Sequence, residues 1–197
     1  MSSKQNRRTV LRNIALGTSA VIAAPAMSFA KNFEDKKHYK LKGNINHSVS
    51  RWTFGYLSLD DLCEAVKTIG FSAIDLVKPQ DWPTLQKHGI YSSMCYTSGD
   101  NNLYNGLDNT KYHEQLIKEY LETIPIMAKA GYKNLICFSG SRRGMDDETG
   151  MKNCEEGLKK ILPLAEKNNV ILHMELLNSK VNHKDYMCDK TPWGVEL

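Results

Sequence analysis

One carboxylate stands out because it interrupts an apolar run. Residues 170–180 read VILHMELLNSK, so Glu175 follows valine, isoleucine and leucine residues. Aliphatic residues in so short a run favour a buried strand, and Asn168 and Asn169 before it are typical of a turn. An ionised carboxylate in such a strand carries a large desolvation cost unless a metal ion or a basic partner offsets it. Glu175 is therefore either held by a salt bridge to a lysine, or it is a metal ligand or a general base.

Turn and capping residues divide the chain into alternating strands and helices. Ser58 followed by two aspartates indicates the start of a helix, and Gly70 indicates its end. By the same signals, strands are predicted at residues 44–49, 72–77, 90–97 and 134–138 and in the run with Glu175. Helices are predicted at residues 59–69, 81–89, 110–130 and 151–167, with a glycine-rich loop over 139–150. This alternation implies a parallel sheet with right-handed crossovers.

Two α/β architectures fit that order. A doubly wound open sheet is expected to carry a glycine-rich phosphate turn after its first strand, and residues 47–51 (HSVSR) contain no glycine. In a (β/α) barrel, polar residues at the carboxyl ends of successive strands converge on one site. Every predicted strand ends that way, with His47, Ser48 and Arg51; Asp75 and Lys78; Tyr96 and Thr97; Ser139, Arg142 and Arg143; and Glu175 and Asn178. The sequence therefore predicts an α/β fold of the (β/α) TIM-barrel type.

Three segments resemble one known family. Residues 71–77 (FSAIDLV), the turn at 138–140 (FSG) with the arginines after it, and residues 175–180 (ELLNSK) resemble the xylose isomerase-like TIM barrels, and among them most the hydroxypyruvate isomerases. The resemblance implies a metal-dependent aldose-ketose proton transfer through an enediolate, on a small sugar or sugar acid. Related ketose epimerases usually place a second acidic residue soon after the glutamate, where this sequence has Val181. That difference favours a hydroxypyruvate-like substrate.

The resemblance also assigns roles to residues. Glu175 is expected to be both the catalytic base and a ligand of a divalent metal, which is Mn, Mg or Zn. His47, Arg142, Asn178 and Lys180 are the expected substrate-binding residues. A guanidinium suits a substrate carboxylate because it donates two parallel hydrogen bonds. Surface ion pairs with Asp146, Asp147 and Glu148 are an equal expectation for Arg142 or Arg143, and His173 is expected to be hydrogen-bonded in the core.

The predicted strands make up only part of a barrel. A full (β/α) barrel has eight strands and roughly 250 residues, whereas this chain has 197 residues and only the first five strands are predicted. Residues 44–197 are therefore expected to be the N-terminal part of a truncated barrel, with the remaining metal ligands outside this chain. Two other readings stay open: a non-catalytic exported barrel that binds a carbohydrate or sugar acid, and a ketose 3-epimerase-like enzyme. An AP-endonuclease-like phosphoesterase is disfavoured because the six histidines form no cluster.

The N-terminus has the composition of a targeting segment. Arg7 and Arg8 precede an apolar stretch at residues 14–26, and Ser28-Phe29-Ala30 offers a small-x-small cleavage site. Residues 1–30 therefore resemble a twin-arginine signal peptide cleaved after Ala30, followed by a lysine-rich linker at 31–43. This predicts an exported, periplasmic protein with no membrane association in its mature form.

Charge and cysteine content exclude further classes. The net charge of +4 comes partly from lysines and arginines in the first 40 residues, so it does not indicate nucleic-acid binding. Five cysteines, an odd number without C-x-x-C spacing, indicate core packing and neither a disulfide framework nor a zinc site.

Overall fold

The computed structural model describes residues 42–99 and 102–197, which belong to one compact unit of the chain. The predicted signal peptide and all but the last two residues of the predicted linker lie outside the described residues. Within the described ranges, no helix has the length and apolar character needed to cross a bilayer.

Four short strands form two parallel pairs. β1 (Ser48–Ser50) pairs with β2 (Ala73–Asp75), and β3 (Asn134–Cys137) pairs with β4 (Ile171–Met174). Residues 90–97 join the pairs through isolated parallel bridges, from Tyr91 to Ala73 and from Cys95 to both Val77 and Leu135. The strands therefore follow one another in chain order, and the predicted parallel pairing is confirmed.

The prediction of a continuous strand at residues 90–97 is wrong. Between the two bridging residues, the hydroxyl of Ser92 donates a hydrogen bond to the carbonyl of Met94 at 2.9 Å. Such a local bond between side chain and backbone competes with the hydrogen-bond ladder of a sheet. The segment therefore touches its neighbours at single residues and does not form a regular strand.

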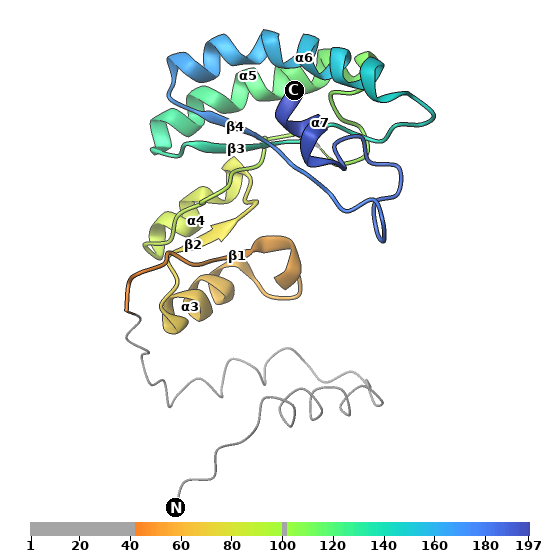
Figure 1. Cartoon of the computed structure of the whole chain (residues 1–197). Coiled ribbons are helices and arrows are strands. Elements are labelled where there is room, and N and C mark those ends of the chain that lie inside the picture. The colour runs from red at the N-terminus through yellow and green to blue at the C-terminus, as the bar shows by residue number, and fades with distance from the viewer. Residues whose placement is uncertain (1–41, 100–101) are drawn as a thin grey trace, which may run out of the picture. The chain divides into compact units, whose positions relative to one another are not determined.

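The helices alternate with the strands as predicted. They are α3 (Leu59–Ile69), α4 (Trp82–Lys87), α5 (His113–Ala130), α6 (Asp147–Lys167) and α7 (Thr191–Glu196), with 3-10 turns at Arg51–Phe54, Pro79–Asp81 and Thr110–Tyr112. The hydroxyl of Ser58 accepts a hydrogen bond from Asp61 N at 3.1 Å, and Gly70 ends α3 with φ 93°, which confirms both capping predictions. Figure 1 shows α5 and α6 lying side by side over the β3–β4 pair.

Helix α6 begins four residues earlier than predicted. Asp146 caps it by accepting a hydrogen bond from Thr149 N at 2.8 Å. Gly150, which favoured a loop in the sequence, is buried inside the helix, and a Cβ added there would overlap the side chain of Met187. This glycine therefore reflects close packing and not a turn.

The two faces of the strands differ in polarity. Ile74, Leu135 and Cys137 are fully buried in the core shared with the helices. The opposite face carries Asp75 and His173, which are only partly buried. The strand before Glu175, predicted to be buried, is thus buried mainly on one side, and Ile171 of β4 is 54% exposed.

Gly106 offers a test of this packing. A Cβ at Gly106 would overlap backbone atoms of Ser139 and Gly140, which cannot rotate away as a side chain can. We expect Gly106→Ala to lower the free energy of unfolding by about 3 kcal/mol, measured by urea denaturation.

A matched control is Gly55→Ala, because the nearest atom to a Cβ there is Trp52 O at 3.6 Å. We expect that change to stay within about 0.5 kcal/mol of the wild type. Equal stability of the two variants would contradict the close approach at Gly106.

Candidate active site

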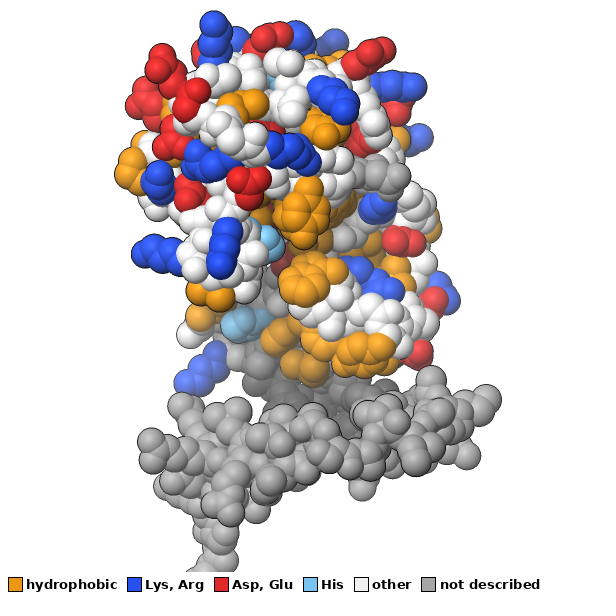
Figure 2. Space-filling model, turned by 90° about the vertical axis from the view of Figure 1, so that its right-hand side faces the viewer, with side chains coloured by type: hydrophobic (Ala, Val, Ile, Leu, Met, Phe, Trp, Pro, Cys, Tyr) orange, Lys and Arg blue, Asp and Glu red, His pale blue; other side chains and the backbone are white. Residues whose placement is uncertain are grey.

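A hollow of about 360 Å³ lies at the carboxyl ends of the strands, on their polar face. Because the strands are parallel, these ends meet at one edge of the sheet. The hollow is lined by Ser50, Asp75, Leu76, Met94, Ile136, His173, Met174 and Glu175. The loops that follow β1 and β4 lie on the side seen in Figure 2, where hydrophobic side chains gather near the middle.

Glu175 stands in this hollow directly after β4. Its backbone N–H continues the ladder by donating to Cys137 O at 3.0 Å. In the described part of the chain, no side chain pairs with the Glu175 carboxylate or donates a hydrogen bond to it. Burial raises the pKa of Glu175 because it disfavours the charged form, and the charge of His183 partly opposes this. A salt bridge to a lysine therefore does not explain this carboxylate.

Asp75 is a second carboxylate in the hollow, and it is well bonded. It accepts hydrogen bonds from the hydroxyls of Ser48, at 2.6 Å, and Ser93. Asn134 extends the network by donating to Ser93 O at 2.8 Å and accepting from His173 Nε2 at 3.1 Å. The resulting polar belt crosses the sheet from β1 to β4 and fixes the orientation of Asp75 and His173. The hydrogen bond predicted for His173 is therefore present.

The sequence placed Asp75 at a strand end without giving it a role. The pattern Ala73-Ile74-Asp75, in which an acidic residue ends an apolar strand, is the feature of the sequence that could have identified this residue. The structure brings together Asp75, His173 and Glu175.

The four predicted substrate-binding residues do not line the hollow. His47 is exposed and stacks on Phe71, with ring centroids 5.1 Å apart. Asn178 and Lys180 are exposed in the loop after β4, where the amide oxygen of Asn178 accepts a hydrogen bond from Lys180 N at 2.9 Å. The guanidinium of Arg142 is bound by Asp147, Asp189 and the carbonyl of Met187.

Glu175 could supply one of the several ligands that a metal ion needs. Its carboxylate is half-buried and receives no hydrogen bond from the described residues, so its oxygens are available. Both oxygens of Asp75, by contrast, already accept hydrogen bonds from serines. Residues 42–99 and 102–197 contain no group of three or more histidine, cysteine, aspartate or glutamate side chains that could hold a metal ion. A metal held through Glu175 therefore needs further ligands from outside these residues.

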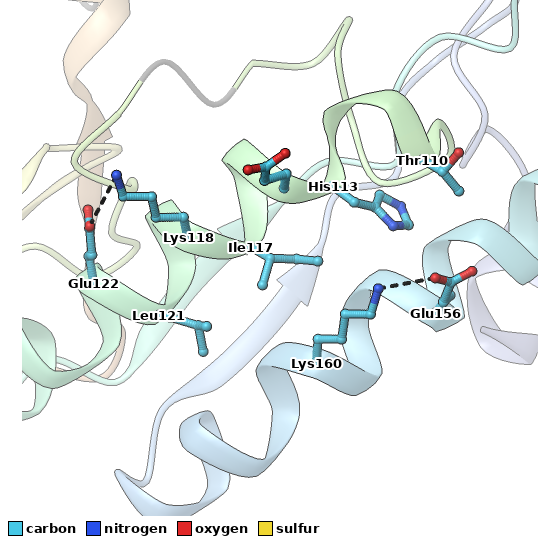
Figure 3. Close-up of a pocket in the computed structure, with 9 residues that line it drawn as sticks. Thr110, His113, Ile117, Lys118, Leu121, Glu122, Glu156 and Lys160 are labelled. Atoms are coloured by element: carbon cyan, nitrogen blue, oxygen red, sulfur yellow. Dashed lines mark hydrogen bonds and ion pairs between the residues drawn. The ribbon is translucent and has the colours of Figure 1, made fainter.

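A larger groove of about 670 Å³ lies on the helical side of the chain, between α5 and α6 (Figure 3). Ile117 and Leu121 form part of its lining. Its two lysines are neutralised, Lys118 by Glu122 at 4.0 Å and Lys160 by Glu156 at 3.1 Å. Paired surface charges over aliphatic side chains are typical of a helix-helix groove, so we do not place the site there.

The sequence comparison adds to this geometry. The profile of the xylose isomerase-like TIM barrel family matches residues 63–191, which contain Asp75, Arg142 and Glu175. The chain belongs to the xylose isomerase-like TIM barrel family. A comparison with curated proteins gave no match.

Several solved structures have a similar fold. The AP endonuclease, family 2, from Brucella melitensis is 13% identical with a TM-score of 0.61, over 73% of this chain and 59% of that one. The IolI protein with a bound zinc atom is 15% identical with a TM-score of 0.61, over 77% and 57%. The D-psicose 3-epimerase with D-tagatose from Clostridium cellulolyticum H10 is 14% identical with a TM-score of 0.56, over 77% and 58%. The chain thus spans less than two thirds of the length of these structures.

Asp108, which the sequence did not single out, is a buried carboxyl beside the turn after β3. It is 0% exposed, and neither carboxylate oxygen has a hydrogen-bond partner among the described residues. Burial raises the pKa of Asp108 to about 7, with Arg143 and Arg142 opposing the shift and Asp185 adding to it. The carboxyl therefore holds its proton in the folded protein at mildly acidic pH.

This predicts a pH-dependent stability. An unfolded aspartate loses its proton near pH 3.9, whereas folded Asp108 keeps it to about pH 7. The folded state therefore binds one more proton between these values, so its stability falls as pH rises through this window and the loss is complete above it. We expect the decline to be at most about 4 kcal/mol, and to be absent in Asp108→Asn. Urea denaturation at several pH values measures it, and an equal decline in both proteins would contradict the prediction.

Proposed function

We propose that Glu175 is the catalytic carboxylate of a metal-dependent isomerase that acts on a sugar acid or a small sugar. The observation that carries this proposal is the half-buried carboxylate of Glu175, without a hydrogen-bond donor, in a hollow at the carboxyl ends of parallel strands. Burying an ionisable group without a partner costs stability, and such groups concentrate at functional sites. Membership of a family named for xylose isomerase supports the same reaction class.

The proposed reaction interconverts an α-hydroxy ketone and an α-hydroxy aldehyde, with hydroxypyruvate as the substrate. The carboxylate of Glu175 removes the proton from the hydroxyl-bearing carbon and returns it to the neighbouring carbonyl carbon. The hydroxyl proton passes to the former carbonyl oxygen, so that no proton is gained or lost overall. Glu175 would be one ligand of a divalent ion (Mn, Mg or Zn), which would supply positive charge to stabilise the negative charge that develops during the proton transfer.

The polar belt has a supporting role in this proposal. Ser48, Ser93 and Asn134 hold Asp75 and His173 through the hydrogen bonds described above. Fixed polar groups around a reacting atom orient a hydroxylated substrate without reorganising during the reaction. Asn178 and Lys180, which follow Glu175 by three and five positions, are the proposed contacts for the rest of the substrate.

A ketose 3-epimerase is the second candidate. The structural neighbours include a D-psicose 3-epimerase, and a 3-epimerase also removes a proton from a carbon beside a carbonyl. Val181, in place of a second acidic residue, favours hydroxypyruvate over free ketoses.

We also propose that residues 1–30 direct export to the periplasm.

Substitution of the glutamate tests the proposal. We expect Glu175→Gln to lower Mn²⁺-dependent hydroxypyruvate isomerisation about 10³-fold, because the amide cannot accept the proton. The exposed Glu166→Gln is the control with the same change of charge on α6, and it should leave the rate unchanged. The assay applies to this chain and to any longer natural form of the protein.

The outcomes separate the candidates. Turnover of D-psicose or D-tagatose but not of hydroxypyruvate would favour the 3-epimerase. Full activity of the Glu175→Gln protein would contradict the catalytic assignment in either case.

A further inference from the structure

The segment after Glu175, residues 176–189, forms a closed loop that we call the Glu175 loop. The loop closes at its base, where Leu177 N donates to Cys188 O at 3.1 Å. Its returning arm runs antiparallel to the residues after β3, with a bridge between Tyr186 and Ser141 and a hydrogen bond from Met187 N to Gly140 O at 2.8 Å. The path of this loop is therefore fixed against the end of the neighbouring strand.

Arg142 contacts the returning arm at three residues. Its backbone N–H donates to Asp185 O at 2.7 Å. Its Nη2 donates to Met187 O at 2.9 Å and to Asp189 Oδ1 at 3.0 Å, while Nη1 binds Asp147 at the start of α6. Both terminal nitrogens of the guanidinium are thus engaged by protein groups, and the side chain is only 18% exposed.

Asp189 connects Arg142 to the outgoing arm of the loop. Its second oxygen, Oδ2, accepts a hydrogen bond from Ser179 Oγ at 2.6 Å. Ser179 lies between Asn178 and Lys180, four positions after Glu175. A continuous series of contacts therefore runs from Asp147 through Arg142 and Asp189 to Ser179, and ties both arms of the Glu175 loop to α6.

Asp189 is shielded from solvent slightly better than Arg142, with its side chain 12% exposed. Ion pairs in such surroundings are screened little, and removing one member leaves the other charge unpaired. The neighbouring Arg143 differs, because it is exposed and its guanidinium binds Asn105 Oδ1 at 2.7 Å and lies over the ring of Tyr112.

We propose that Arg142 is a positioning residue that acts through Asp189 and Ser179, holding the Glu175 loop so that Asn178 and Lys180 keep a fixed position relative to Glu175. In this role Arg142 does not bind the substrate carboxylate. The series of contacts from Asp147 to Ser179 follows from the hydrogen bonds described above. Only the effect of this series on catalysis rests on the proposed function.

Hydrogen exchange measures the order of the loop without any assay of activity. We expect Arg142→Gln and Asp189→Asn each to raise exchange about tenfold or more at the amides of His183, Met187 and Cys188, which are hydrogen-bonded within the loop or to the turn after β3. The double variant should exchange no faster than either single one, because both changes break the same series of contacts. Arg143→Gln, with the same loss of charge, should leave these amides unchanged.

Two results of the exchange experiment would overturn the proposal. One is an Asp189→Asn protein whose loop exchanges as slowly as the wild type. The other is an effect of Arg142→Gln that is matched by Arg143→Gln. If Arg142→Gln unfolds the whole chain, Asp189→Asn, which keeps the arginine, still decides the question.

Kinetics distinguish positioning from direct substrate binding. In the hydroxypyruvate assay, a positioning role predicts that Arg142→Gln, Asp189→Asn and the double variant lower kcat/KM by the same factor. Direct binding of the substrate carboxylate predicts a raised KM for Arg142→Gln alone, with additive effects in the double variant, and that pattern would overturn the proposal. If neither this chain nor any longer natural form of the protein shows isomerase activity, the proposed function fails, while the exchange data still decide the role of Arg142 in the loop.

Discussion

The turn after β3, residues 138–140, is the point on which the loops around the site depend. All three residues are buried, so their polar backbone groups must find partners within the protein. The loop before α5 supplies Leu107 N and Asp108 N, which donate to the carbonyls of Phe138 at 3.1 Å and Ser139 at 2.6 Å. The Glu175 loop supplies Met187 N to Gly140 O, Cys188 N to Ser139 Oγ at 2.9 Å, and the Tyr186 hydroxyl, which accepts from Ser139 N at 3.1 Å.

This arrangement connects packing to the proposed chemistry. Two loops from different parts of the chain bind the same turn, so the surroundings of Glu175 are fixed by contacts that do not include Glu175 itself. The close approach leaves no space for a Cβ at Gly106 or Gly140, and it leaves the carboxyl of Asp108 without a partner among the described residues. Electrostatic catalysis by the unpaired carboxylate of Glu175 requires rigid surroundings, since reorganisation of these groups during the reaction would raise the activation barrier.

The local features of the fold were predictable from the sequence, because they depend on neighbouring residues. Ser58 and Gly70 bound α3 as their chemistry indicates, and the strand before Glu175 lies where its aliphatic residues place it. The features that depend on distant residues were not predictable. Gly150 is typical of a loop in the sequence, and only its contact with Met187 explains why it lies inside a helix. Arg142 likewise forms an ion pair with Asp189, 47 positions away. The same distinction holds for the site. Glu175 could be predicted from its own segment, whereas a role for Asp75 becomes evident only because the strands bring it into the same hollow.

The proposed reaction depends on the binding of a divalent metal by the carboxylate of Glu175. The most direct measurement is anomalous X-ray diffraction from crystals, grown with Mn²⁺, of this chain and of any longer natural form of the protein, because it locates the ion without assuming a substrate. We expect an anomalous peak within coordination distance of a Glu175 carboxylate oxygen, in the hollow that also contains Asp75 and His173. An ion bound elsewhere, with the Glu175 carboxylate free of metal, would contradict it.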